Sequence, residues 1–289
     1  MKAIYFGSGS NNIATKLGKN LIHWGSNTLT DVFPKTSVKL SEHLLCSPTK
    51  PKRNRTLDDS FQRHEIEVLG HRVRLYSKGD SDKAIFFVHG WSGQGSNYKR
   101  FMKDALKNGY SVWTMDHVGH GESSGIYSNF FLYVAGLEEA YRYARARNQI
   151  VGMVGHSMGA SAIISAHLPE DLACVLLAPV IPFFENMQDV ITGFGISPRM
   201  IHNLFKEIEG RTGRNFDEIN PRIAWTKFKN PRMIFHDVKD PFIPLEKNLE
   251  TMSKEESINL NVTNGLGHFR ILHDSSVIYQ SMDFFNQED

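Results

Sequence analysis

The sequence predicts an α/β fold built on a mostly parallel sheet. Short apolar runs that suit strands alternate with helical stretches from residue 62 onward, and turn residues separate them. The run Ala84–Val88 is apolar at every position, which is typical of a strand covered on both faces of a parallel sheet. Strands that alternate with helices indicate crossover connections and therefore an α/β architecture.

The elements follow from this pattern in chain order. The first two strands, Glu65–Leu69 and Arg72–Tyr76, flank Gly70 and His71, which is a hairpin signal. Six further strands are expected at Ala84–Val88, Ser111–Met115, Ile150–Val154, Ala173–Ala178, Arg232–His236 and Leu260–Val262. Helices are expected at Tyr98–Lys107, Leu132–Arg147, Ala160–His167 and Ser276–Phe285. Residues 182–230 interrupt the alternation with helical and loop pieces.

Composition excludes several classes of protein. The chain has 289 residues, 40% of them hydrophobic, and a net charge of +2, which is ordinary for a globular protein and not for a disordered or collagen-like one. Its two cysteines are too few and too far apart for a disulfide framework or a zinc site. No apolar run approaches the 18 residues of a membrane span, and no secretory signal is visible. We therefore expect a cytoplasmic protein.

Residues 1–60 differ from the rest of the chain in charge. They carry nine basic and four acidic residues, whereas the remaining 229 carry 24 and 27. A nucleic-acid-binding protein would show a denser basic patch interleaved with aromatic residues, so we expect no nucleic-acid partner. The asymmetry instead marks a boundary between a basic N-terminal extension, residues 1–60, and a core of residues 61–181 and 231–289.

The extension is expected to be partly helical. Apolar residues recur at helical spacing over residues 11–24 and form a stripe. Gly25 and Ser26 are predicted to end this helix, and Pro34 limits a second short helical piece. The stripe consists of Ile13, Leu17, Leu21 and Trp24, and the second piece holds Leu29, Val32 and Phe33. We interpret this as a helix that packs on the main domain. The alternative is a basic amphipathic helix in weak contact with a membrane surface. Residues 47–53 are expected to form a linker.

The sharpest chemical signal is the motif Gly155-His156-Ser157-Met158-Gly159. A predicted strand leads into it and a helix of small residues follows, which is the strand–turn–helix setting of a nucleophile elbow. The sharp turn places the serine in a strained backbone conformation, and glycine is needed where the helix passes close behind the strand. Ser157 is therefore the candidate nucleophile.

A serine hydroxyl needs a base that removes its proton and an acid that orients the base. Asp240 follows the strand Arg232–His236, and His268 follows the strand Leu260–Val262 within Gly-Leu-Gly-His. Both come after carboxyl ends of predicted strands, where sites form in α/β sheets. Asp237 competes with Asp240 for the acid position. We favour Asp240, because a loop of a few residues is needed to carry the carboxylate beyond the strand.

A third element supplies hydrogen-bond donors for an oxyanion. The motif His89-Gly90-Trp91 follows a buried strand, and the backbone N–H groups of Trp91 and Met158 are the expected donors. His89 is interpreted as a side chain that braces this loop. Asp116 and His120 suggest a loop-stabilising network. A metal role for His120 is disfavoured because no third ligand is evident.

These motifs resemble the α/β-hydrolase superfamily, in its branch of serine esterases and lipases. The resemblance covers roughly residues 62–289 through H-G-W, D-x-x-G-H-G-x-S, G-H-S-M-G and a late Asp…His pair, in that order. It implies an eight-stranded, mostly parallel sheet, an acyl-serine mechanism without cofactor or metal, and a helical cap formed by residues 182–230. Seven residues are then candidates for the substrate pocket: Trp91, His156, Phe183, Phe184, Met187, Phe194 and Trp225.

The predicted function is hydrolysis of small carboxylic esters with short to medium acyl chains. Ser157 is expected to attack the carbonyl, His268 to accept its proton, and Asp240 to orient His268. Activity should fall at acid pH, where the base is protonated. A thioesterase, an amidase or peptidase, and a ligand receptor that keeps the fold without turnover are the alternatives, and the fold does not separate them. The sequence leaves the oligomeric state open.

Overall fold

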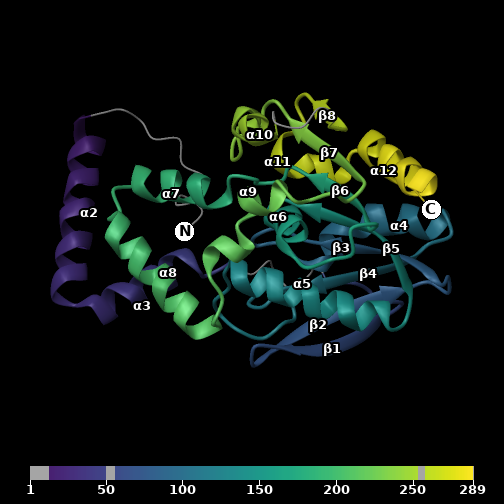
Figure 1. The fold of residues 1–289 in the computed structure, drawn as a ribbon, viewed down its shortest axis with the longest axis horizontal. Coiled ribbons are helices and arrows are strands. Elements are labelled where there is room, and N and C mark those ends of the chain that lie inside the picture. Colours follow the sequence, from purple (N-terminus) through teal and green to yellow (C-terminus); the bar gives the residue numbers. More distant parts are fainter. Residues whose placement is uncertain (1–12, 50–55, 253–257, 289) are drawn as a thin grey trace.

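An eight-stranded sheet forms the centre of the computed structural model, which describes residues 13–49, 56–252 and 258–288 (Figure 1). The spatial order of the strands is β1-β2-β4-β3-β5-β6-β7-β8. Their bounds are β1 Gln62–Val68, β2 His71–Lys78, β3 Lys83–Val88, β4 Ser111–Asp116, β5 Gln149–His156, β6 Ala173–Leu177, β7 Arg232–Asp237 and β8 Leu260–Thr263. All eight predicted strands are confirmed to within a few residues.

The sheet is parallel apart from its first edge. β1 pairs antiparallel with β2 and β2 antiparallel with β4, whereas every pair from β4 to β8 is parallel. Alternate side chains of β3 enter different cores: Phe86 packs toward one face and Phe87 toward the other. The fold is therefore that of an α/β-hydrolase, as predicted, and the carboxyl ends of its parallel strands gather at one edge.

Helices cover both faces of the sheet. α5 (Phe130–Arg145) and α6 (Met158–Ser165) pack on one face, and α4 (Lys99–Lys107) and α12 (Ser275–Glu288) pack on the other. Three of these helices, α5, α6 and α12, begin one or two residues earlier than predicted. Asn129 caps α5 by accepting a hydrogen bond from the backbone N–H of Leu132 at 3.0 Å. The remaining short helices are η2 Gly95–Tyr98, α10 Leu245–Met252, α11 Gly267–Arg270 and η4 Ile271–His273.

Residues 182–230 form a helical layer beside the sheet. It consists of α7 (Phe183–Gly193), α8 (Pro198–Thr212), η3 (Phe216–Ile219) and α9 (Pro221–Trp225). The amphipathic stretch of α8 buries the side chains Met200, Ile201, Leu204 and Ile208. We refer to α7–α9 as the cap.

The N-terminal segment contains two helices, α2 (Ile13–Val32) and α3 (Pro34–Leu45), and α3 packs against α8 of the cap. The predicted helix end at Gly25 was wrong, because α2 continues through this residue. A glycine inside a helix costs only about 1 kcal/mol, which tertiary contacts offset. Pro34 begins α3, in agreement with the preference of proline for the first helical position, where its missing N–H is not needed.

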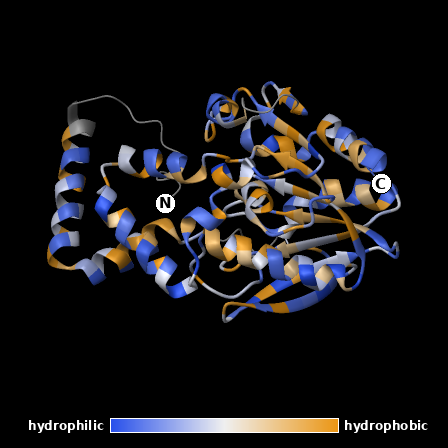
Figure 2. Ribbon diagram, in the orientation of Figure 1, coloured by the Kyte–Doolittle hydropathy of each residue, from blue (hydrophilic) through white to orange (hydrophobic). Residues whose placement is uncertain are grey.

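The apolar stripe of α2 does not face the main domain, so that interpretation was also wrong. Leu17, Leu21 and Trp24 are exposed, with Leu21 at 74% and Trp24 at 75%. Figure 2 shows hydrophobic residues on α2, which lies at the edge of the molecule far from the sheet. No helix in the described part of the chain is long and apolar enough to cross a membrane. Residues 50–53 of the expected linker lie outside the described residues.

Candidate active site

Ser157 sits on the sharp turn between β5 and α6. Its backbone angles are φ +53° and ψ −122°, a conformation that residues other than glycine rarely adopt. The N–H of Ser157 donates to the carbonyl of Leu177 on β6 at 2.9 Å, which holds the turn against the neighbouring strand. The strain predicted for this position is therefore present, and local hydrogen bonding maintains it.

Both glycines of the motif are required by close backbone approach. A Cβ atom on Gly155 would lie 2.7 Å from Cα of Ala160, and one on Gly159 would lie 2.3 Å from the carbonyl oxygen of Val88. In both cases the obstacle is backbone, which cannot rotate away. The motif therefore fixes α6 against β5 and β3, and Ser157 lies at the start of that helix.

His268 and Asp240 meet beside the elbow. Nδ1 of His268 donates to Oδ2 of Asp240 at 2.7 Å, and both side chains are buried. The other carboxylate oxygen of Asp240 accepts the backbone N–H groups of Phe242 and Ile243 at 2.9 and 3.0 Å. Burial raises the pKa of Asp240, but the hydrogen bond and charge of His268, followed by the two backbone N–H groups, outweigh it and hold the pKa below its ordinary value. Asp240 is therefore ionised at neutral pH.

His156 fixes His268 from the opposite side. Its Nε2–H donates to the carbonyl oxygen of His268 at 2.7 Å, and the two rings lie 4.7 Å apart. Burial, followed by the charge of His268, lowers the pKa of His156 to about 3, so the ring stays neutral and keeps this hydrogen bond. His156 lines the cavity, as predicted, and also positions His268, which the sequence did not suggest.

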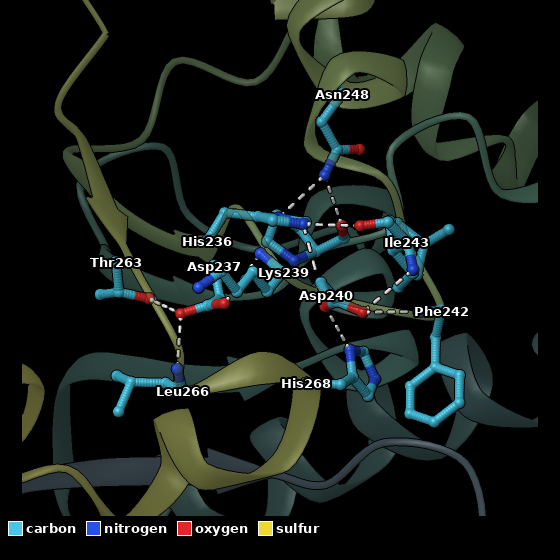
Figure 3. A network of polar contacts seen from close by, with 12 residues as sticks. His236, Asp237, Lys239, Asp240, Phe242, Ile243, Asn248, Thr263, Leu266 and His268 are labelled. Atoms are coloured by element: carbon cyan, nitrogen blue, oxygen red, sulfur yellow. Dashed lines mark hydrogen bonds and ion pairs between the residues drawn. The ribbon is translucent and has the colours of Figure 1, made fainter.

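A second histidine braces the acid loop (Figure 3). Nε2 of His236 donates to the carbonyl of Ile243 at 2.9 Å and lies 3.8 Å from Oδ2 of Asp240. Nδ1 of His236 accepts from Nδ2 of Asn248 at 3.2 Å, and Asn248 also donates to the carbonyl of Pro179 at 2.7 Å. This buried chain connects the loop after β7 to the loop after β6. No motif pointed to Asn248.

Asp237 has a different role from Asp240. Oδ2 of Asp237 accepts from Thr263 and from the N–H of Leu266, both at 2.8 Å, while Oδ1 accepts from the N–H of Lys239 at 2.9 Å and of Gly265 at 3.2 Å (Figure 3). The residue thus ties the loop after β8, which carries the candidate base, to the end of β7. The structure places Asp240, and not Asp237, against His268.

Replacing Asp237 with Asn is expected to lower stability in a pH-dependent way. Burial raises the pKa of Asp237, but the hydrogen bonds from Thr263 and the backbone outweigh it and lower the pKa from 3.8 to about 2. A depressed pKa stabilises the folded state above about pH 4, and this contribution is lost as the pH falls toward 2. In urea unfolding at pH 7, the free energy of unfolding of the variant should be lower than that of the wild type by roughly 2 kcal/mol.

At pH 3 the difference between Asp237→Asn and the wild type should shrink, because the wild-type contribution is then partly lost. If the free energy of unfolding differed between the variant and the wild type by the same amount at pH 3 and pH 7, the stabilising role assigned to ionised Asp237 would be contradicted.

The loop after β3 lies directly against the elbow. A Cβ atom on Gly90 would be 3.0 Å from Cβ of Ser157. Trp91 follows Gly90 on this loop, and Met158 is the first residue of α6, where helix N–H groups have no partner within the helix. The arrangement brings together the two segments that carry the expected oxyanion donors, Trp91 and Met158.

Neutral histidines hold this loop in place. Nδ1 of His89 donates to the carbonyl of Gly90 at 2.7 Å, and its Nε2 accepts the N–H of His117 at 3.0 Å. Burial lowers the pKa of His89, which keeps it uncharged. His120 accepts the N–H of Ser92 at 3.0 Å through Nε2. The predicted bracing role of His89 is confirmed by these contacts.

The buried carboxylate of Asp116 organises the next loop. It accepts the N–H of Gly95 at 2.8 Å, the N–H of Glu122 at 2.9 Å and the hydroxyl of Tyr76 at 2.9 Å. The predicted network at Asp116 and His120 is thus a set of loop contacts. Within the described residues, no group of three His, Cys, Asp or Glu side chains could hold a metal ion.

A cavity opens in front of the elbow, between the sheet edge and the cap. Ser157, Met158 and His268 line it together with the predicted pocket residues Trp91, His156, Phe183, Phe184 and Met187. Phe130 stacks on Phe183 with ring centroids 4.4 Å apart. Further apolar lining residues come from α7, α8, η3, α11 and the loop after β7: Val190, Ile191, Leu204, Phe205, Ile208, Phe216, Phe242, Ile243 and Phe269.

Two predicted pocket residues do not line this cavity. Phe194 follows the last turn of α7, where Gly195, with φ +88°, turns the chain toward α2. Trp225 is buried in the cap, with Phe228 stacked at 6.0 Å and the guanidinium of Arg232 4.8 Å above its ring. Trp225 thus serves packing, and neither side chain lines the cavity, so their assignment to the pocket was wrong.

The N-terminal segment contributes to the cavity, which the sequence did not predict. Leu45 and Cys46, at the end of α3, are buried and line the wall. Burial, followed by the charge of Glu42, raises the pKa of Cys46 to about 12. The thiol is therefore protonated at neutral pH, and Ser157 is the better nucleophile. In the sequence, the only feature that could have indicated this contribution to the cavity is the apolar group Leu44-Leu45-Cys46 before the expected linker.

Residues 79–239 match the family model described as serine aminopeptidase, S33, which is more than half of the chain. The chain belongs to this family of α/β-hydrolases. It is 25% identical over 207 residues to a bifunctional esterase/perhydrolase of Acinetobacter calcoaceticus, covering 69% of the chain and 67% of that protein. It is also 32% identical over 146 residues to a dihydrolipoyllysine-residue acetyltransferase component of the acetoin cleaving system of Cupriavidus necator. This match covers 50% of the chain and only 38% of the Cupriavidus protein.

Solved structures share the fold of this S33-family chain. The Pyrococcus furiosus esterase Pf2001 has a TM-score of 0.63 and 21% identity, and the match covers 84% of the chain and 97% of the esterase. Est1E of Butyrivibrio proteoclasticus, solved with bound ferulic acid, has a TM-score of 0.56 and 19% identity, covering 78% of the chain and 98% of Est1E. The chain is thus a serine hydrolase by family, with esterase-like neighbours.

Proposed function

We propose that the protein hydrolyses carboxylic esters whose acyl group is apolar. The observation that carries this proposal is the position of Ser157 on a strained elbow in the same cavity wall as His268, whose ring is held by Asp240 at 2.7 Å. Ser157 attacks the ester carbonyl, and His268 accepts the hydroxyl proton through Nε2. The resulting oxyanion accepts hydrogen bonds from the N–H groups of Trp91 and Met158.

The second half of the reaction uses the same groups. His268 returns its proton to the leaving alcohol, and the acyl group remains on Ser157 as an ester. Water then transfers a proton to His268 and attacks this ester, after which the carboxylic acid leaves and Ser157 regains its proton. Asp240 stays ionised throughout and stabilises the imidazolium that forms in each half.

The wall of the cavity favours a neutral acyl group over an N-terminal amino group. A free amino terminus is an ammonium ion, and an enzyme that binds it in an apolar cavity needs a carboxylate to offset its desolvation. The described residues that line the cavity are mostly aromatic and aliphatic, and none of them is Asp, Glu, Lys or Arg. Apart from Ser157 and the two histidines, the polar side chains among them are Ser128, Asn129 and Asn186. This supports ester hydrolysis rather than aminopeptidase activity.

A matched substrate screen tests this. We expect kcat/KM for p-nitrophenyl esters to rise from acetate to medium-chain acyl groups, by roughly 3-fold to 4-fold per buried methylene. The corresponding acyl thioesters and p-nitroanilides, measured in parallel, separate an esterase from a thioesterase and an amidase. Faster cleavage of amino-acid p-nitroanilides with a free amino group than of esters would overturn the proposal.

A further inference from the structure

One face of α2 exposes large apolar side chains to solvent. Leu17, Leu21 and Trp24 lie on one arc of the helix at spacings of four and three residues, and Val32 and Phe33 continue the exposed apolar surface at its end, each with 59% exposure. We call these five residues the α2 face. Several large apolar side chains exposed on one helix in this way are typical of a binding site rather than of a solvated helix.

The opposite, polar side of α2 attaches it to the rest of the molecule. The N–H of Ser197, at the start of α8, donates to Oγ of Ser26 at 3.0 Å, and Oγ1 of Thr30 bonds Oγ of Ser37 on α3 at 2.9 Å. A Cβ atom on Gly195 would lie 2.3 Å from the carbonyl oxygen of Lys19, so the backbones touch. Specific polar contacts thus hold the helix with its apolar face outward.

Two lysines without an ion pair lie on α3, which begins directly after the α2 face, whereas the acidic residues of the two helices are neutralised. Asp31 pairs with Arg199 at 2.7 Å and Glu42 pairs with Arg211 at 2.6 Å. Lys35 and Lys39 are exposed on α3 and form no ion pair with any described residue. A partner for the α2 face should therefore combine an apolar layer with negative charge.

We propose that the α2 face docks the protein on the surface of an anionic lipid bilayer. Leu17, Leu21 and Trp24 enter the headgroup and upper acyl region, with α2 parallel to the surface, while Lys35 and Lys39 contact lipid phosphates. Trp24 suits this boundary because its indole has an apolar body and a polar N–H.

The helix α2 lies close to the helices that form the wall of the cavity. α2 contacts α3 and α8, and it lies beyond the cap at the edge of the molecule opposite α12 (Figure 1). Leu45 at the end of α3 and Leu204 on α8 line the cavity. A bilayer bound to the α2 face would therefore lie across α2 from the helices that form the cavity wall. The docking itself does not depend on ester hydrolysis.

Vesicle flotation with the full chain tests the proposal. We expect binding to phosphatidylcholine vesicles that contain about a third phosphatidylserine, and much weaker binding to phosphatidylcholine alone. The pair Leu21→Gln and Trp24→Gln, which keeps good helix-forming residues, should weaken binding at least about tenfold. Lys35→Gln with Lys39→Gln should weaken binding to the anionic vesicles roughly 30-fold, because each lysine near the surface contributes about 1 kcal/mol.

Matched controls alter an exposed aromatic residue and two exposed lysines elsewhere on the surface. Tyr279→Gln replaces an aromatic side chain that is 72% exposed on α12, and Lys103→Gln with Lys229→Gln removes two exposed lysines that lie outside the N-terminal segment. These variants should bind vesicles like the wild type, and circular dichroism checks the fold of each. Equal losses in the test and control pairs would overturn the proposal.

The fluorescence of Trp24 separates a bilayer from a protein partner. Anionic vesicles should shift the emission to shorter wavelength and protect the indole from acrylamide, and both effects should disappear in Trp24→Gln. If light scattering instead shows that the chain dimerises through the α2 face in solution, and vesicles leave acrylamide quenching unchanged, the face binds a second copy and the proposal fails.

Discussion

Ser157→Ala is expected to lower kcat/KM for p-nitrophenyl esters by about 10⁶-fold, because no other group at the elbow can form the acyl intermediate. The cavity also contains Cys46, but burial keeps its thiol protonated. Ser165→Ala is a suitable control. Ser165 is a buried serine on the same helix, and its hydroxyl has no hydrogen-bond partner among the described residues, so its loss should leave turnover unchanged.

Covalent labelling complements these rates. A fluorophosphonate probe should modify Ser157 in the wild type and leave Ser157→Ala unlabelled. The proposal that this chain is a receptor without turnover predicts the absence of labelling in both. Wild-type rates in Ser157→Ala, with the fold intact by circular dichroism, would contradict the serine mechanism altogether.

The sheet and the positions of the candidate triad could be predicted because they depend on local patterns and on the strand order of the sheet. An all-apolar run such as Ala84–Val88 indicates a buried strand wherever it lies, and the elbow glycines follow from close approach of α6 to its neighbours. Parallel strands end at one edge of the sheet, so Ser157, Asp240 and His268 could be placed together before any distance was known.

The remaining features depend on contacts between distant segments. Helical spacing identified the stripe on α2 but not which side of the helix faces the protein, because that is decided by Ser26, Thr30 and their partners in α3 and α8. The buried amide of Asn248 carries no motif, since its role arises only when α10 meets the loops after β6 and β7.

Asp240→Asn is expected to lower kcat by about 10⁴-fold while leaving KM little changed. Oδ1 of Asp240 accepts two backbone N–H groups, from Phe242 and Ile243, so the amide oxygen of Asn must occupy that position. The amide NH₂ then faces Nδ1 of His268 and donates to it. His268 would carry its proton on Nε2 and could no longer accept a proton from Ser157.

Asp237→Asn is the matched control for this prediction. Asp237 lies three residues earlier, but it accepts from Thr263 and from backbone N–H groups, whereas Nδ1 of His268 donates to Asp240. Its replacement should reduce stability and leave most of kcat, whereas Asp240→Asn should reduce kcat far more than stability. Steady-state kinetics and urea unfolding of both variants measure the two effects. If the two variants exchanged these effects, Asp237 would be the acid of the triad, and the assignment drawn from the 2.7 Å contact would be wrong.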